Sequence, residues 1–161
     1  MRKNKAMLFH LKQLEKSRSE GSIYLKYPEI SWIIFPDFVE WDGCVLLRQE
    51  EKLRLPKKFE PNQFCPDRTC YEANVNHVHL DDYIDEVKNC PYEGLRIGLK
   101  ILDIWKLKLK SQFPIKKFIL ILTFDGNDCV LRFHTYRDDT LPWIDASSLN
   151  DYKEGVLLLE I

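Results

Sequence analysis

The feature that most constrains the fold is an apolar segment preceded by a long amphipathic one. Residues 118–124 are apolar at every position except Thr123, which predicts a central strand covered on both faces. Upstream, residues 92–112 carry apolar side chains at helical spacing, with Pro91 before them and Pro114 just after. Prolines at these positions are typical of helix boundaries. The apolar face of this helix is broad, so it must pack against a sheet or several helices.

The remaining segments predict further strands and one more helix. Asp42-Gly43 separates two short apolar runs and is typical of a two-residue type I′ hairpin turn. The other patterns are a short amphipathic helix at 5–17, β structure through 23–49 including the apolar run 30–35, and strands at 129–136 and 155–161. We therefore predict a single α+β domain over residues 1–161, a mostly antiparallel sheet with the helix of about 92–112 on one face. Residues 50–72 are expected to form a long surface connection.

The composition is that of an ordinary soluble globular protein. The 161 residues are 45% hydrophobic and 30% charged, with 24 basic and 25 acidic side chains and a formal charge of −1. These values exclude disorder and collagen-like repeats, and the balanced charge argues against a dedicated nucleic-acid binder.

The charge is unevenly distributed along the chain. Residues 94–117 hold seven basic side chains and one acidic one, whereas residues 125–161 hold eight acidic and three basic ones. Each segment is either the solvated face of its own element or part of a dipolar surface that steers a charged partner. In the second case the acidic loops favour a basic protein as the partner.

Cysteine usage and the absence of targeting segments favour a cytoplasmic protein. The chain has five cysteines, an odd number that favours reduced thiols over a disulfide framework. The apolar run 6–9 after the basic N-terminus is too short for a signal peptide. No stretch approaches the roughly 18 apolar residues of a membrane span.

Two histidines mark a candidate metal site. In an extended segment His77 and His79 share one face, while Val78 and Leu80 point into the core. Cys65 and Cys70 lie just upstream, and thiolates and imidazoles are the ligands that zinc prefers. The alternative is that the histidines only form hydrogen bonds at a strand end, with Asp81 or Asp82 capping a short helix.

A catalytic centre has little support in the sequence. His134 lies on the polar face of its predicted strand, where it either pairs with Asp81 or Asp82 as a general base or is a partly exposed sheet residue. The chain contains no Gly-rich phosphate loop, no GxSxG and no HExxH motif, which argues against a nucleotide-dependent enzyme. We expect a protein without catalytic residues and without a cofactor, with zinc as the alternative.

A tryptophan among acidic residues is a candidate contact for a protein partner. Trp143 either caps the core or is exposed beside the carboxylates of its loop, and an aromatic anchor within a polar rim is typical of a binding hot spot. The residues predicted to contact a partner are Asp81, Asp82, Asp138, Asp139, Trp143 and Asp145.

Several segments of residues 74–161 carry a resemblance to a known family. They are Asn-His-Val-His-Leu at 76–80, the helical segment 98–106, Leu-Arg-Phe-His-Thr-Tyr-Arg at 131–137, Pro-Trp-Ile-Asp at 142–145 and Tyr-Lys-Glu at 152–154. Together they resemble small uncharacterised bacterial cytosolic proteins, some of which are similar to immunity proteins of polymorphic toxin systems. The resemblance implies a non-enzymatic protein that neutralises a cognate toxin by covering its active surface.

Three hypotheses follow from the sequence. The first is a protein-binding domain, in particular an immunity protein whose partner is a basic toxin domain. The second is a metal-dependent hydrolase that uses the His-x-His pair. The third, nucleic-acid binding through the lysine-rich segment 100–117, is disfavoured by the balanced charge.

Overall fold

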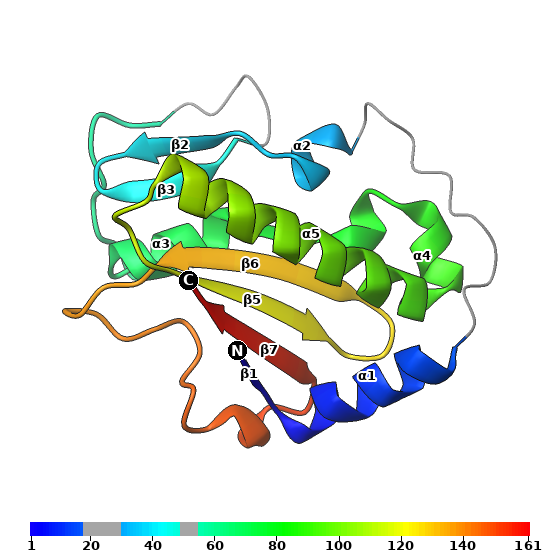
Figure 1. Ribbon diagram of the computed structural model, residues 1–161. Helices are drawn as coiled ribbons and strands as arrows, with labels where there is room; N and C mark the ends of the chain where they lie inside the picture. Colours follow the sequence, from blue (N-terminus) through cyan, green and yellow to red (C-terminus); the bar gives the residue numbers. More distant parts are fainter. Residues whose placement is uncertain (18–29, 49–54) are drawn as a thin grey trace.

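A five-stranded antiparallel sheet forms the centre of the protein in a computed structural model that describes residues 1–17, 30–48 and 55–161. Its strand order is β1-β7-β5-β6-β4, and a separate two-stranded sheet pairs β2 with β3 (Figure 1). The strands are β1 (Arg2–Lys3), β2 (Phe38–Trp41), β3 (Cys44–Leu47), β4 (His77–His79), β5 (Phe118–Phe124), β6 (Cys129–Thr135) and β7 (Gly155–Glu160). The helices are α1 (Lys5–Lys16), α2 (Ser31–Ile34), α3 (Arg68–Val75), α4 (Asp85–Asn89) and α5 (Pro91–Gln112), with 3-10 turns η1 (Leu80–Asp82) and η2 (Leu149–Asp151).

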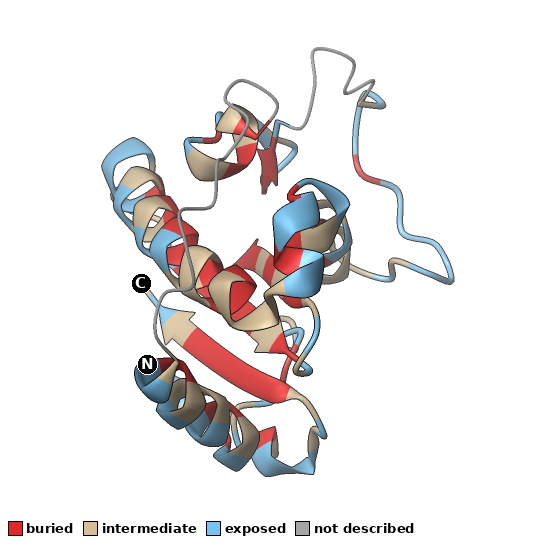
Figure 2. Cartoon of the chain, turned by 90° about the vertical axis from the view of Figure 1, so that its right-hand side faces the viewer, coloured by how far each residue is buried: buried red, intermediate tan, exposed pale blue. Residues whose placement is uncertain are grey.

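The central strand β5 divides its side chains between two cores. Phe118, Leu120, Leu122 and Phe124 belong to the larger core with Trp105 and the other buried side chains of α5. Ile119 and Ile121 point to the opposite face, where they pack with residues of β7 and the loop before it. Figure 2 shows buried residues along the strands and on the inner faces of the helices. The predicted α+β fold, with a mostly antiparallel sheet and the long helix on one face, is confirmed.

Close approach of α5 to the sheet requires a residue without a side chain. A Cβ atom at Gly98 would lie 2.5 Å from the Sγ atom of Cys129 on β6, a distance that real Cβ contacts do not reach. Gly98 therefore allows the helix to pack directly over the strand.

The predicted hairpin turn is also confirmed. Asp42 and Gly43 have φ angles of 45° and 79°, and the register pairs Trp41 with Cys44 across them. Positive φ at both central residues defines the type I′ turn. The Arg68 side chain donates hydrogen bonds to the backbone oxygen and carboxylate of Asp42, which ties the turn to the start of α3.

Two sequence predictions of secondary structure are wrong. The apolar run 30–35 contains the short helix α2 instead of a strand. A short apolar run does not distinguish a buried strand from a buried helix, and here the Ile33 carbonyl accepts a hydrogen bond from the indole of Trp105. Residues 68–72, expected within a surface connection, begin α3. The β prediction for residues 23–29 lies outside the described part of the chain.

Helix α3 completes the edge of β6 with side chains. In the described part of the chain, strand β4 pairs only with residues 130–132 of β6, so the next backbone groups of that edge need other partners. The carboxylate of Glu72 accepts from the Thr135 N–H, and the amide of Asn76 donates to the Phe133 carbonyl. The same two side chains also bind the backbone of β3 at Val45 and Leu47. They thereby join the small sheet to the large one.

Candidate functional site

The second face of the sheet, opposite α5, is covered by the loop of residues 136–154. Ile144 and Leu149 of this loop are buried against the sheet, so the chain runs back across the strands before it enters β7 (Figure 1). Polar residues of β4 and β6 lie on this same face, because His77 is paired with Arg132 and His79 with Val130. The histidines of β4 therefore lie on the same face of the sheet as Arg132 and the loop 136–154.

Hydrogen bonds hold the loop in place at three points, on α3, on β6 and on the residue before α1. The hydroxyl of Thr140 lies 2.8 Å from that of Thr69 on α3. The Trp143 N–H donates to Nε2 of His134 over 3.4 Å. At the far end, the side-chain amide of Asn4 donates to the carbonyls of Leu149 and Glu154 over 3.1 and 2.7 Å. The loop is thus preorganised although it contains little regular structure.

Trp143 stacks on a partly buried arginine. The guanidinium carbon of Arg132 lies 4.7 Å from the centroid of the Trp143 ring, a cation–π geometry. The two residues line a pocket of about 260 Å³ together with Tyr152, Glu154 and several β5 and β6 side chains. Burial lowers the pKa of Arg132 and raises that of Glu154. The Nη1 atom of Arg132 is buried without a hydrogen-bond partner in the described residues.

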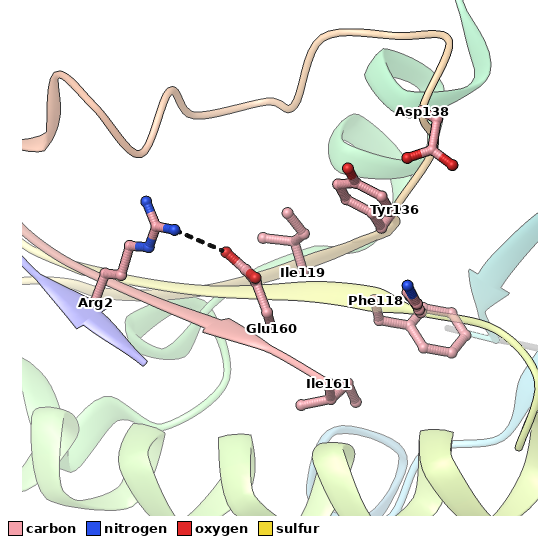
Figure 3. A pocket seen from close by; sticks show the side chains of 8 residues that line it. Arg2, Phe118, Ile119, Tyr136, Asp138, Glu160 and Ile161 are labelled. Atoms are coloured by element: carbon pink, nitrogen blue, oxygen red, sulfur yellow. Dashed lines mark ion pairs between the residues drawn. The ribbon is translucent and has the colours of Figure 1, made fainter.

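The outer side of the loop carries exposed apolar and acidic side chains. Leu141 is 86% exposed and Trp143 is 38% exposed, and Asp138, Asp139 and Asp145 are exposed around them. Asp138 also lines an open pocket of about 560 Å³ with Tyr136, Glu160 and Ile119, and Glu160 there forms an ion pair with Arg2 (Figure 3). These exposed side chains include four of the six that the sequence predicts as partner contacts, and that role stays a prediction.

The six predicted contact residues do not form a single surface. Asp81 and Asp82 lie in η1, near Asp128 at the start of β6, whereas Asp138 and Asp139 follow the end of that strand. A strand rises about 3.3 Å per residue, so the length of β6 separates the two groups by roughly 20 Å. The structure groups Asp138, Asp139, Trp143 and Asp145 in one loop and places Asp81 and Asp82 elsewhere.

Asp81 belongs to a second cluster, at the edge of the sheet. Among the described residues, the ligand atoms of His79, Asp81 and Asp128 lie within 4.8 Å of one another. The Nδ1 atom of His79 is 2.6 Å from Oδ2 of Asp128, while Oδ1 of Asp128 is buried and has no hydrogen-bond partner in the described part of the chain. Burial, with a contribution from the charge of Asp81, raises the pKa of Asp128, whereas His79 lowers it.

The other predicted metal ligands are not part of this cluster. His77 packs ring-to-ring with His79 at 5.4 Å, as their shared strand face predicts, but its Nδ1 atom is 2.6 Å from the Asn74 carbonyl. The Asn74 amide also lies 3.6 Å from the Sγ atom of Cys65 and 3.4 Å from that of Cys70. These two thiols form a separate group on and before α3. The zinc site of two cysteines and two histidines stays a prediction.

His134 is almost fully buried, not partly exposed as the sequence suggested. Its Nδ1 atom is 3.0 Å from the Thr135 carbonyl, and its Nε2 atom accepts from the Trp143 N–H. The neutral imidazole with a proton on Nδ1 satisfies both contacts. Burial lowers the pKa of His134, opposed by the Thr135 carbonyl and the charge of Glu72.

We expect acid to destabilise the protein through this histidine. The folded pKa is below the unfolded value of 6.5, so the unfolded state binds more protons as the pH falls through that value. The free energy of unfolding should therefore fall from pH 6.5 downward and level off below the folded pKa. Denaturant titrations between pH 7.5 and 5 measure this slope.

The variant His134→Gln should reduce the slope, to which His10 should contribute in the same direction. Burial also lowers the pKa of His10, against the opposing charge of Asp125. The carboxyl groups of Asp128 and Glu154, whose pKa values are raised, oppose this slope. A slope unchanged in His134→Gln would show that His134 takes up its proton equally in both states.

Sequence reasoning did not select Arg132, Glu154 or Asp128. Strand alternation puts Arg132 on the same face as His134, but its contact with Trp143 depends on a loop whose path the sequence does not specify. Asp128 is 49 residues from His79 in the chain. The antiparallel pairing of 77–79 with 130–132 brings the start of β6, and with it Asp128, next to the end of β4.

A comparison with protein families identifies the wider group. A family model described as "Uncharacterized protein PM0498 family" matches residues 2–161, which is nearly the whole chain. The chain belongs to the PM0498 family. One relative is the protein described as "Uncharacterized protein PM0498" from Pasteurella multocida (strain Pm70), with 31% identity over 104 residues, 62% of this chain and 61% of the relative. The match therefore spans less than two thirds of that relative's length.

Two further comparisons concern structure and membranes. No solved structure matches this chain. Within the described residues, every helix is too short or too polar to cross a membrane.

Proposed function

We propose that this member of the PM0498 family is a protein-binding domain whose contact surface is the loop 138–145. The observation that carries the proposal is the exposure of Leu141 and Trp143 between exposed carboxylates, on a backbone that is held in place. An apolar anchor in a polar rim is the usual composition of a binding hot spot. A loop that is already ordered loses less conformational entropy when a partner binds.

The charge of this surface favours a basic partner. Asp138, Asp139 and Asp145 are exposed, and the Asp145 pKa is lowered by hydrogen bonds from Ser147, so it is ionised at neutral pH. Exposed carboxylates accelerate the encounter with a basic surface in a salt-dependent manner. The more specific form of the proposal, an immunity protein that covers the active surface of a bacterial toxin, rests on the sequence resemblance alone. A cytoplasmic location belongs to the same proposal.

The proposal can be tested by crosslinking from the surface itself. A photo-crosslinking amino acid at position 141 of the full chain, expressed in the native host, should capture a protein that the same amino acid at position 107 does not. Leu107 is a matched control because it is also exposed but lies on α5. The captured protein is then purified and its affinity for the unmodified chain is measured.

Substitutions then establish whether the loop provides the affinity. Trp143→Ala should weaken binding of the captured protein at least about 10-fold, as loss of a hot-spot side chain does. The double variant Asp138→Lys/Asp139→Lys should slow association at low salt, with a smaller effect at high salt. Unchanged affinity in both variants would exclude the loop as the interface. Growth arrest by the captured protein, relieved by this chain, would support the immunity function, and its absence would reject only that part.

A metal-dependent hydrolase is the alternative function predicted from sequence. The cluster at His79 is the observation in its favour, because a metal ion with open coordination positions can activate water.

A further inference from the structure

We propose that His79, Asp81 and Asp128 bind one divalent metal ion at the edge of the sheet. This ligand set differs from the four residues that the sequence pattern indicated, and it does not depend on the protein-binding proposal. It joins three segments, namely the end of β4, the η1 turn and the turn between β5 and β6.

The backbone brings these three side chains together where the β4–β6 ladder ends. His79 is paired with Val130, the chain after His79 turns into η1 with Asp81, and Asp128 directly precedes β6. The ligand atoms of all three side chains therefore lie within 4.8 Å of one another. The intervening Leu80 and Cys129 are buried on the opposite face, and the Leu80 side chain approaches Gly98 of α5. The core therefore fixes the orientation of the cluster.

The ligand atoms lie close enough for a cation after a small side-chain rotation. Two ligand atoms at 2.0–2.2 Å from a common ion lie no more than about 4.4 Å apart. The ligand atoms of the cluster lie within 4.8 Å of one another, so a shift of a few tenths of an ångström brings them into range. One imidazole nitrogen and two carboxylates suit Mn²⁺, Fe²⁺ and Zn²⁺ better than a soft monovalent ion. With three protein ligands, further coordination positions are open to water or a small ligand.

The second observation is the unmet hydrogen-bonding capacity of Asp128. Its Oδ1 atom is buried and has no partner among the described residues, which is costly for a carboxylate oxygen. Among the described residues, the partner of Asp128 is the His79 imidazole, 2.6 Å away on the other oxygen, while Asp81 adds a second negative charge. A divalent ion would neutralise both carboxylates and provide Oδ1 with a partner.

Mn²⁺ is the probe that best separates this cluster from the Cys65–Cys70 pair, because thiolates prefer softer ions. Titration of Mn²⁺ into the full chain at neutral pH, followed by electron paramagnetic resonance, should give one bound ion per chain. Asp128→Asn and His79→Gln should each weaken binding at least about 100-fold, since even residues behind the ligands contribute 10–100-fold. Asp82→Asn is the matched control, an exposed carboxylate in the same turn, and should change the affinity little because solvent and salt screen its charge.

Paramagnetic broadening localises the ion independently of the variants. Bound Mn²⁺ should broaden the imidazole resonances of His79 while those of His134, near the other end of β6, stay sharp. Thermal unfolding without metal verifies that each variant is folded. The proposal is wrong if Mn²⁺ does not bind. In that case a proton shared between the carboxylates of Asp81 and Asp128 would explain why they lie so close together. The proposal is also wrong if Asp128→Asn and His79→Gln bind normally, or if Mn²⁺ or Zn²⁺ binding is lost in Cys65→Ser instead.

Discussion

Replacing Glu72 with glutamine should destabilise the protein by about 3–5 kcal/mol, the range for breaking a buried charge pair. The Glu72 side chain is fully buried and forms an ion pair of 2.8 Å with Arg137. Its Oε1 atom accepts from the Val45 N–H and the Thr135 hydroxyl, and its Oε2 atom accepts from the Thr135 N–H and Arg137.

A glutamine side chain cannot reproduce this arrangement. Whichever way its amide is oriented, the NH₂ group faces a backbone N–H of either Val45 or Thr135, and the charge of Arg137 loses its counterion. A buried donor without an acceptor costs about 1–3 kcal/mol by itself. The free energy of unfolding measured with denaturant should decrease accordingly, and the melting temperature should fall by roughly 10 °C.

The matched control for Glu72 is an ion pair at the surface. Lys88→Gln removes the contact with Asp85, and we expect no measurable change in stability because both side chains are exposed. If Glu72→Gln and Lys88→Gln had the same free energy of unfolding, the Glu72 carboxylate would not be required to hold β3 against β6.

Replacing Asn4 with alanine should cost ~3 kcal/mol, through the loss of a helix cap and of buried hydrogen bonds. Asn4 is almost fully buried. Its side-chain oxygen accepts from the Met7 and Val156 N–H groups at 2.8 and 2.9 Å. Its amide nitrogen donates to the carbonyls of Leu149 and Glu154. The substitution leaves these backbone groups without their partner and releases the C-terminal end of the loop 136–154.

Asn150→Ala is the control for this experiment, because Asn150 also accepts a backbone N–H, from Lys5, but in an exposed position. It should cost less than about 1 kcal/mol, as an exposed hydrogen bond does. Equal losses in the two variants would contradict the importance of burial. Chemical denaturation gives both values, and hydrogen exchange of residues 149–154 should increase only in Asn4→Ala.

Most of the sheet and its covering helix were predictable from local pattern. The apolar segment 118–124 and the amphipathic segment 92–112 each require burial wherever they lie, and Asp42-Gly43 encodes its turn by backbone preference alone. Helix α3 was missed because most of its buried face is polar, with Thr69 and Glu72 beside one small apolar residue, Ala73. Glu72 and Asn76 carry no apolar periodicity, and their burial is possible only because the edges of β3 and β6 lie against them.

The candidate sites also combine features that the sequence predicts with features that depend on the tertiary structure. The shared face of His77 and His79 follows from strand alternation, and the acidic loop with Trp143 is visible in the sequence. The sequence could not indicate that Asp128 joins His79 and Asp81, or that Arg132 lies under the Trp143 ring. The sequence by itself determined where most helices, strands and turns form, through hydrophobic periodicity and turn residues. The tertiary structure alone decided which elements pair and in which register, because that choice depends on burying all apolar faces and satisfying all buried polar groups at once.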